Sequence, residues 1–264
     1  MAIQTNLDSD KIAPIVEEFQ LPSCGLLYDG KLGPTVKIHP YSFDTERYLM
    51  TNLKGNEKMA RVAAVCLKLG KDGLQPDALL MHDVFTILAI ARGLTYGEQY
   101  SFRSECPECD FKETHQVKVP KDLPVKTWSE YATKEELEKA MEFTLPHGGD
   151  KIAIRHFTMK DENDLESTAN QIAAASRSDL DEERYMTRLA MHLVSVNGGV
   201  PENHTEARKY IKRLEGPNMV AYEEGIGNKR CGIVFAWQVL CGGEGCTHRY
   251  EALVPMAGNF FRGD

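Results

Sequence analysis

Residues 92–120 read RGLTYGEQYSFRSECPECDFKETHQVKVP, and much of the architecture can be worked out from them. Tyr100 and Phe102 alternate with polar residues before the CPEC motif, and the alternation resumes after it at Val117 and Val119. A period of two is typical of a strand with one buried face. The stretch therefore predicts a β-hairpin whose tip carries two thiols.

A second stretch near the end of the chain has the same order. Residues 233–255 read IVFAWQVLCGGEGCTHRYEALVP, with an alternating run over Ile233–Leu240, two cysteines and a further strand that ends in Pro255. The thiols are spaced C-x-x-x-x-C, and the glycines between them let the backbone turn tightly. A second thiol-bearing hairpin is therefore expected.

Together the two thiol pairs predict one shared zinc site. Zinc prefers four soft or borderline ligands in a tetrahedron, and two hairpin tips with two thiolates each supply that set. Because such a site contributes folding free energy, we interpret it as structural. The expected ligands are Cys106, Cys109, Cys241 and Cys246.

Other interpretations of the cysteines stay open at this point. The knuckles could be reduced and metal-free, whereas a disulfide framework is disfavoured by seven cysteines in a chain without a secretory signal. A thioredoxin-like role is disfavoured because strands flank the CPEC motif. His248 is a substitute ligand if one cysteine drops out. Cys24, Cys66 and Cys231 are interpreted as small core or contact residues.

An internal repeat is the preferred explanation of two similar segments, TVKIHPYSFDTERYL (35–49) and KIAIRHFTMKDENDL (151–165). At one offset they share an apolar strand residue, a hydroxyl that caps a helix, an acid in its first turn and a leucine. The aligned pairs are Ile38 with Ile154, Ser42 with Thr158, Glu46 with Glu162 and Leu49 with Leu165. In the first half, helices are expected over 45–53, 57–69 and 78–94.

These patterns predict an α+β fold of two tandem similar halves, each with helices and a small antiparallel sheet that ends in a cysteine knuckle hairpin. Four parts are expected: an N-terminal arm (1–30), a first half with the CxxC hairpin (31–122), a connector (123–146), and a second half with the CxxxxC hairpin (147–264). The arm contains LPSCGLLY (21–28), and we expect it to bind a partner protein; the alternative is that it caps the chain's own core.

Composition limits the classes of partner. The chain has 264 residues, 42% of them apolar, and 31 basic against 39 acidic side chains, which is globular with a net charge of −8. Nucleic-acid binders usually carry a basic surplus, so no nucleic-acid partner is expected. No apolar run reaches the ~20 residues that span a bilayer, and no secretory signal is visible. We therefore expect no membrane partner and a cytosolic location.

The sequence shows no phosphate-binding loop, dinucleotide fingerprint, nucleophile elbow or H-E-x-x-H motif, so no enzymatic activity, catalytic residue or organic cofactor is expected. Asp161, Glu162 and Asp164 are interpreted as acids that complement a helix dipole. His82 and His192 lie in mainly apolar patterns and are interpreted as core or interface residues.

Several stretches resemble the baseplate hub proteins of contractile-tailed bacteriophages, the group typified by the hub assembly protein of T-even phages. The stretches are LPSCGLLY (21–28), KIHPYSFDTERYL (37–49), RGLTYGEQYSFRSECPEC (92–109) and the terminal pair Phe260 and Phe261.

The resemblance implies a non-enzymatic structural or assembly component of the tail baseplate. It would act in the host cytoplasm and in the virion tail, with other hub or wedge proteins and the tape-measure protein as partners. Two alternatives remain: a cytosolic zinc-ribbon adaptor or nucleic-acid module, and an enzyme with no recognisable motif.

Overall fold

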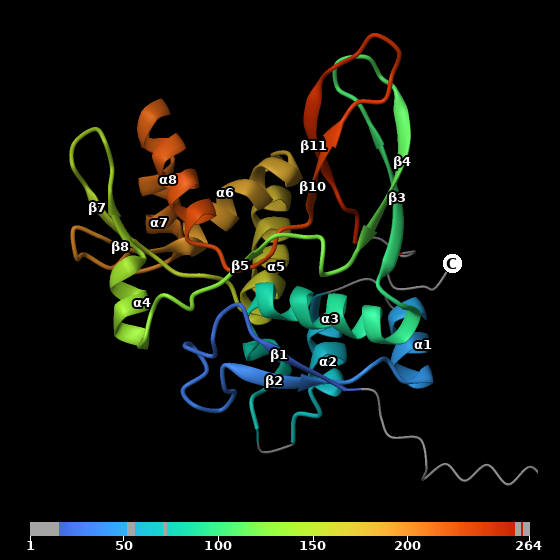
Figure 1. Ribbon diagram of the computed structural model, residues 1–264. Helices are drawn as coiled ribbons and strands as arrows, with labels where there is room; N and C mark the ends of the chain where they lie inside the picture. Colours follow the sequence, from blue (N-terminus) through green and yellow to red (C-terminus); the bar gives the residue numbers. More distant parts are fainter. Residues whose placement is uncertain (1–15, 52–55, 71–72, 257–259, 261–264) are drawn as a thin grey trace, which may run out of the picture.

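The computed structural model describes residues 16–51, 56–70, 73–256 and 260 (Figure 1). The protein is an α+β structure with small antiparallel sheets, as the sequence predicts. Within these ranges, no helix has both the length and the apolar character that a membrane crossing requires. The helices are α1 (Phe43–Thr51), α2 (Asn56–Cys66), α3 (Met81–Tyr96), α4 (Lys134–Ala140), α5 (Met159–Ser176), α6 (Leu180–His192), α7 (His204–Ile211) and α8 (Gly216–Asn228).

The described strands form four two-stranded sheets, β1–β2, β3–β4, β5–β9 and β10–β11, and one three-stranded sheet, β6–β7–β8. Every pairing is antiparallel. The strands are β1 (Glu17–Gln20), β2 (Thr35–Ile38), β3 (Gln99–Glu105), β4 (Lys112–Lys118), β5 (Val125–Lys126), β6 (Glu142–Thr144), β7 (Lys151–Ile154), β8 (Leu193–Val196), β9 (Gly232–Ile233), β10 (Ala236–Leu240) and β11 (Arg249–Leu253).

Helices α1 and α5 begin at the caps that the sequence predicts. The Thr45 N–H donates to Ser42 Oγ over 3.2 Å, directly before α1. At α5 the Asp161 N–H donates to Thr158 Oγ1, while the Thr158 N–H donates back to the Asp161 carboxylate, which makes a capping box. Helix α3 begins at Met81 rather than at the expected residue 78, because Pro76–Ala78 form a 3-10 turn.

Helix α3 is the centre of a single hydrophobic core that extends through both predicted halves. The halves meet beside its first residue, where the Met81 N–H donates to the Phe157 carbonyl and the Met159 N–H donates to the Leu79 carbonyl. Leu80 and Thr158 form an isolated β-bridge at the same junction. This junction, called the seam below, holds the two halves in contact.

The part of the predicted arm that the structure describes belongs to the chain's own core, which corrects the expectation that LPSCGLLY binds a partner. Leu21 is fully buried, and β1 just before it pairs with β2. The Ser23 N–H and hydroxyl and the Tyr28 hydroxyl all donate to the buried Asp83 carboxylate. Because these donors satisfy the buried Asp83 carboxylate, the segment 21–28 is part of the fold. Residues 1–15 of the predicted arm lie outside the described ranges.

The stretch 123–146, expected as a connector, is built into the same structure. Its strand β5 pairs with β9, and its strand β6 pairs with β7. The side chains of Trp128 and Leu137 are buried. The stretch therefore links the first half to the sheets of the second half through pairing and packing.

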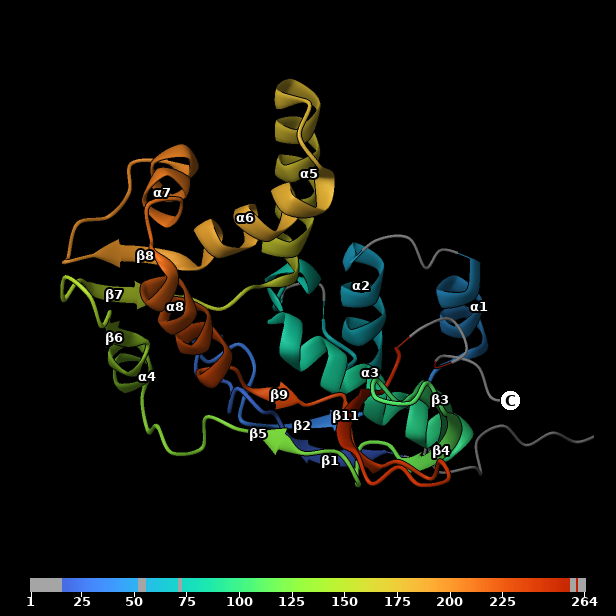
Figure 2. The same cartoon turned by 90° about the horizontal axis from the view of Figure 1, so that it is seen from above.

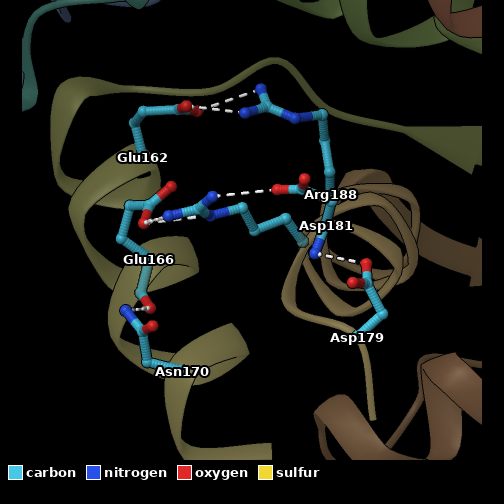
Figure 3. A network of polar contacts seen from close by, with 7 residues as sticks. Glu162, Glu166, Asn170, Asp179, Asp181 and Arg188 are labelled. Atoms are coloured by element: carbon cyan, nitrogen blue, oxygen red, sulfur yellow. Dashed lines mark hydrogen bonds and ion pairs between the residues drawn. The ribbon is translucent and has the colours of Figure 1, made fainter. Parts of the chain in front are cut away.

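Helix α5 projects from the rest of the protein (Figure 2), and ion pairs join it to α6 (Figure 3). Arg188 pairs with Glu162, and Arg184 bridges Glu166 and Asp181. Glu162, expected only to complement a helix dipole, is thus also half of an interhelical ion pair. Asp161 likewise accepts two hydrogen bonds from the Arg155 guanidinium.

Candidate metal centre

Hairpin β3–β4 carries the first thiol pair. Its strands pair from Gln99 opposite Lys118 to Glu105 opposite Lys112. The Cys106 N–H then donates to the Phe111 carbonyl over 2.9 Å and closes the tip. The alternation in the sequence faithfully indicated which residues of β3 face inward, because Tyr100 and Phe102 are both buried.

Hairpin β10–β11 carries the second thiol pair. The Cys241 N–H donates to the His248 carbonyl over 2.9 Å, just beyond the last paired residues of the strands. The Gly243 N–H donates to Cys241 Sγ over 3.3 Å. A Cβ atom at Gly243 would lie 3.3 Å from Cys109 Sγ, so glycine lets this loop approach the opposite thiol.

The two hairpins project side by side from the helices, with their tips together (Figure 1). Cys109 Sγ lies 3.5 Å from Cys241 Sγ, and Cys106 Sγ lies 4.0 Å from Cys246 Sγ. All four sulfur atoms lie within 4.8 Å of one another, which confirms that Cys106, Cys109, Cys241 and Cys246 converge. A tetrahedron with bonds of about 2.3 Å has edges of about 3.8 Å, and the two sulfur–sulfur separations of 3.5 Å and 4.0 Å bracket that length.

The electrostatics of the four thiols favour a bound cation. Burial would raise the pKa of Cys106, but hydrogen bonds from the backbone N–H groups of Glu108 and Cys109, together with nearby thiols, lower it. The Gly243 N–H lowers the pKa of Cys241, whereas burial and the other three thiols raise it to about 12. Four thiolates this close repel one another unless a positive charge lies between them, and metal binding deprotonates such ligands.

A hydroxyl connects the two hairpins below their tips. Ser104 Oγ is hydrogen-bonded to the Tyr250 hydroxyl over 2.7 Å and to His115 Nε2 over 2.8 Å. Ser104 lies on β3, His115 on β4 and Tyr250 on β11, so one side chain joins three strands. Sequence reasoning missed this brace, although the period of two places Ser104 on the same face as Tyr100 and Phe102.

The remaining cysteines and His248 are not part of the cluster. Cys66 and Cys231 are buried, as expected, and burial raises the pKa of Cys66 to about 12. Cys24 is half-buried in the Leu21–Tyr28 segment. The His248 ring stacks on Tyr250, and among the described residues the four cysteines are the only group close enough to share a metal ion.

The seam gathers three histidines, of which the sequence indicated two. His82 and His192 are largely buried, and burial lowers the pKa of each to about 3. His156, which sequence reasoning missed, lies between them with ring centroids 6.0 Å and 6.2 Å away. It is 4% exposed, and neither of its ring nitrogens has a hydrogen-bond partner among the described atoms.

Comparison with known proteins adds no relative to this geometry: no family model, no curated protein and no solved structure matches the chain.

Proposed function

We propose that Cys106, Cys109, Cys241 and Cys246 together bind one structural Zn²⁺ ion. The observation that carries this proposal is the convergence of four thiols from two hairpins, at separations that suit a tetrahedron. Four protein ligands complete the coordination of zinc and leave no open position for a substrate. The site therefore supports folding rather than catalysis.

The zinc ion would fasten the tips of two hairpins that are far apart in the sequence. The Ser104–Tyr250 hydrogen bond joins the same hairpins below the tips. An isolated two-stranded hairpin is marginally stable in water, so two separate connections make the pair a firm projection. A rigid projection is a suitable element for contacts with other proteins.

We infer further that the chain contains a tandem duplication. In both halves a strand leads through a hydroxyl cap to helices and later to a thiol-bearing hairpin, and Ile38 and Ile154 are buried at matching positions. The second half also contains β8 and β9 before its hairpin. Superposition of β2–α1–α2–α3–β3–β4 on the elements from β7 to β11 tests this inference. Shared strands and helices that superpose with the same directions would support it, and shared elements that do not superpose would contradict it.

We propose that the protein is a non-enzymatic structural or assembly component of a phage tail baseplate, in the hub region. It would act through protein–protein contacts in the host cytoplasm and in the virion tail. Support comes from the resemblance of residues 92–109 to baseplate hub proteins, because these residues form the strand and the tip that lead into the thiol cluster. Other hub or wedge proteins, and the tape-measure protein, are the proposed partners.

Co-expression with the tail proteins encoded near this chain tests the assembly role. The full chain should copurify with a hub, wedge or tape-measure protein, and Cys106→Ser should weaken that association if the hairpin projection makes the contact. Copurification with nucleic acid alone, or with none of those tail proteins, would contradict the proposal. The zinc site is tested separately by metal analysis, so the two proposals can fail independently.

A further inference from the structure

A pocket of about 340 Å³ opens at the seam, between the start of α3 and the segment that follows α8. Its walls combine apolar and cationic side chains. Met81, Phe85 and Phe235 contribute apolar surface, while Lys126 and Arg230 contribute positive charge. A pocket of this size holds one or two side chains of a ligand rather than a whole domain.

Arg230 is a cation without a counter-charge in the described part of the chain. No described side chain forms an ion pair or hydrogen bond with its guanidinium, and burial together with the neighbouring Arg188 lowers its pKa. The neighbouring Arg188 is already paired with Glu162. The Arg230 side chain is exposed at the pocket, so an anion that enters the pocket can pair with it.

The side chains around Arg230 also supply no negative charge. Lys126, on the same pocket wall, has no ion-pair partner among the described residues. His82 lines the pocket and neighbours His156, and neither imidazole contributes negative charge. Asp83, which follows His82 in the sequence, is buried in the core, where its carboxylate accepts hydrogen bonds from Ser23 and Tyr28. The pocket is thus cationic on a chain whose net charge is −8.

We propose that this seam pocket binds an acidic peptide segment of a partner protein. A carboxylate of the peptide pairs with Arg230 and Lys126, and an adjacent apolar side chain packs between Phe85 and Phe235. This binding requires neither the thiol cluster nor a bound zinc ion.

A peptide fits this pocket better than an inorganic anion does. Phosphate would use only the two cations, whereas the apolar walls also need a ligand that removes them from water. Ile233 and Val234 also line the pocket and add apolar surface against which a ligand side chain can pack. An acidic peptide with an apolar side chain would therefore both pair with the cations and bury the apolar walls.

Isothermal titration calorimetry on the full chain tests the proposal with the acetylated peptide Asp-Glu-Leu-Asp-Glu. We expect saturable binding that weakens at least about tenfold in Arg230→Gln, because truncation removes the central charge pair. Lys126→Gln should weaken it by a smaller factor, and raised salt should weaken binding to the unaltered protein. Lys31→Gln, which removes an exposed lysine far from the pocket in sequence, is the matched control and should bind like the unaltered protein.

Two reference ligands separate the peptide from a simple anion. Asp-Glu-Gly-Asp-Glu should bind more weakly than the leucine peptide, and inorganic phosphate at equal ionic strength should not displace the leucine peptide. Thermal unfolding of each variant checks that it folds. Equal affinity in Arg230→Gln, no binding up to about 1 mM peptide, or equal binding of the glycine peptide and phosphate would each overturn the proposal.

Discussion

Cys109 Sγ lies 3.5 Å from Cys241 Sγ, although the two residues are 132 positions apart in the sequence. The contact brings together the tips of two hairpins, one from each predicted half. Two neighbouring thiols from the same tips, Cys106 and Cys246, complete the group. Because this contact closes a long loop of the chain, a metal ion that holds the two tips together should add substantially to the free energy of unfolding.

The hydroxyl brace below the thiols should contribute independently of the metal. Ser104→Ala and Tyr250→Phe should each lower the free energy of unfolding by about 1 kcal/mol, because each removes one hydrogen bond between the hairpins. Urea unfolding of both single variants and the double variant measures the coupling. A double variant whose loss equals the sum of the single losses would contradict a direct bond.

The seam histidines should make the protein sensitive to acid. Burial lowers the folded-state pKa of His82 and His192 to about 3 and that of His156 to about 4, against an ordinary value of about 6.5. Below pH 6.5 the unfolded chain binds protons that the folded chain does not. The free energy of unfolding should therefore fall as the pH drops from about 6.5 towards 4.

His156→Phe should reduce this acid dependence, because it removes one titrating group from the seam. Arg188 and Arg230 also disfavour charge there, and the aromatic Trp128 packs against the His156 ring. Urea unfolding measured from pH 7 to pH 4 gives the slope of the free energy of unfolding against pH. His147→Gln, at an exposed position, is the control. A slope that is unchanged in His156→Phe and lowered in the control would refute the assignment.

The Arg208–Glu183 ion pair should matter more than a surface pair. Both side chains are largely buried, and Arg208 also donates to Thr187 Oγ1. Arg208→Met should cost about 3 kcal/mol of unfolding free energy, because it leaves a buried carboxylate without its cation. Arg61→Met, which breaks the exposed pair with Glu57, should cost at most about 0.5 kcal/mol. Chemical denaturation of both variants compares the two costs, and similar values would count against burial as the cause.

The Leu21–Tyr28 segment should behave as core. Leu21→Ala should lower the free energy of unfolding by about 2–5 kcal/mol, since it empties a fully buried site. Val65→Ala, at a mostly exposed position of α2, should change it by less than about 1 kcal/mol. If Leu21→Ala unfolds like the unaltered protein, the segment is not part of the core.

The sequence predicted those features that local patterns encode. Alternation at Tyr100 and Phe102 indicated a strand and its buried face, and the hydroxyls of Ser42 and Thr158 marked helix starts. The convergence of the four cysteines was predictable because zinc chemistry needs all of them together. The strand and the helix starts depend on residues a few positions apart, and the cysteine pairs are recognised by their short spacings, CxxC and CxxxxC.

The features that the sequence did not predict depend on distant residues. Ser23 binds Asp83 across 60 positions, so nothing within LPSCGLLY shows that it belongs to the core. No local sequence pattern indicates where the His156 side chain lies. It contacts His82 only because the two halves meet at the seam. The uncompensated charge of Arg230 likewise depends on which acids the fold brings near it.

The structural zinc site is tested most directly by the zinc content of the purified full chain, measured without added metal or chelator. We expect about one zinc per chain in the unaltered protein and in the control Cys24→Ser, and a loss of that zinc in Cys106→Ser. An unaltered protein without zinc, or a Cys106→Ser variant that keeps the full amount, would contradict the shared four-cysteine site.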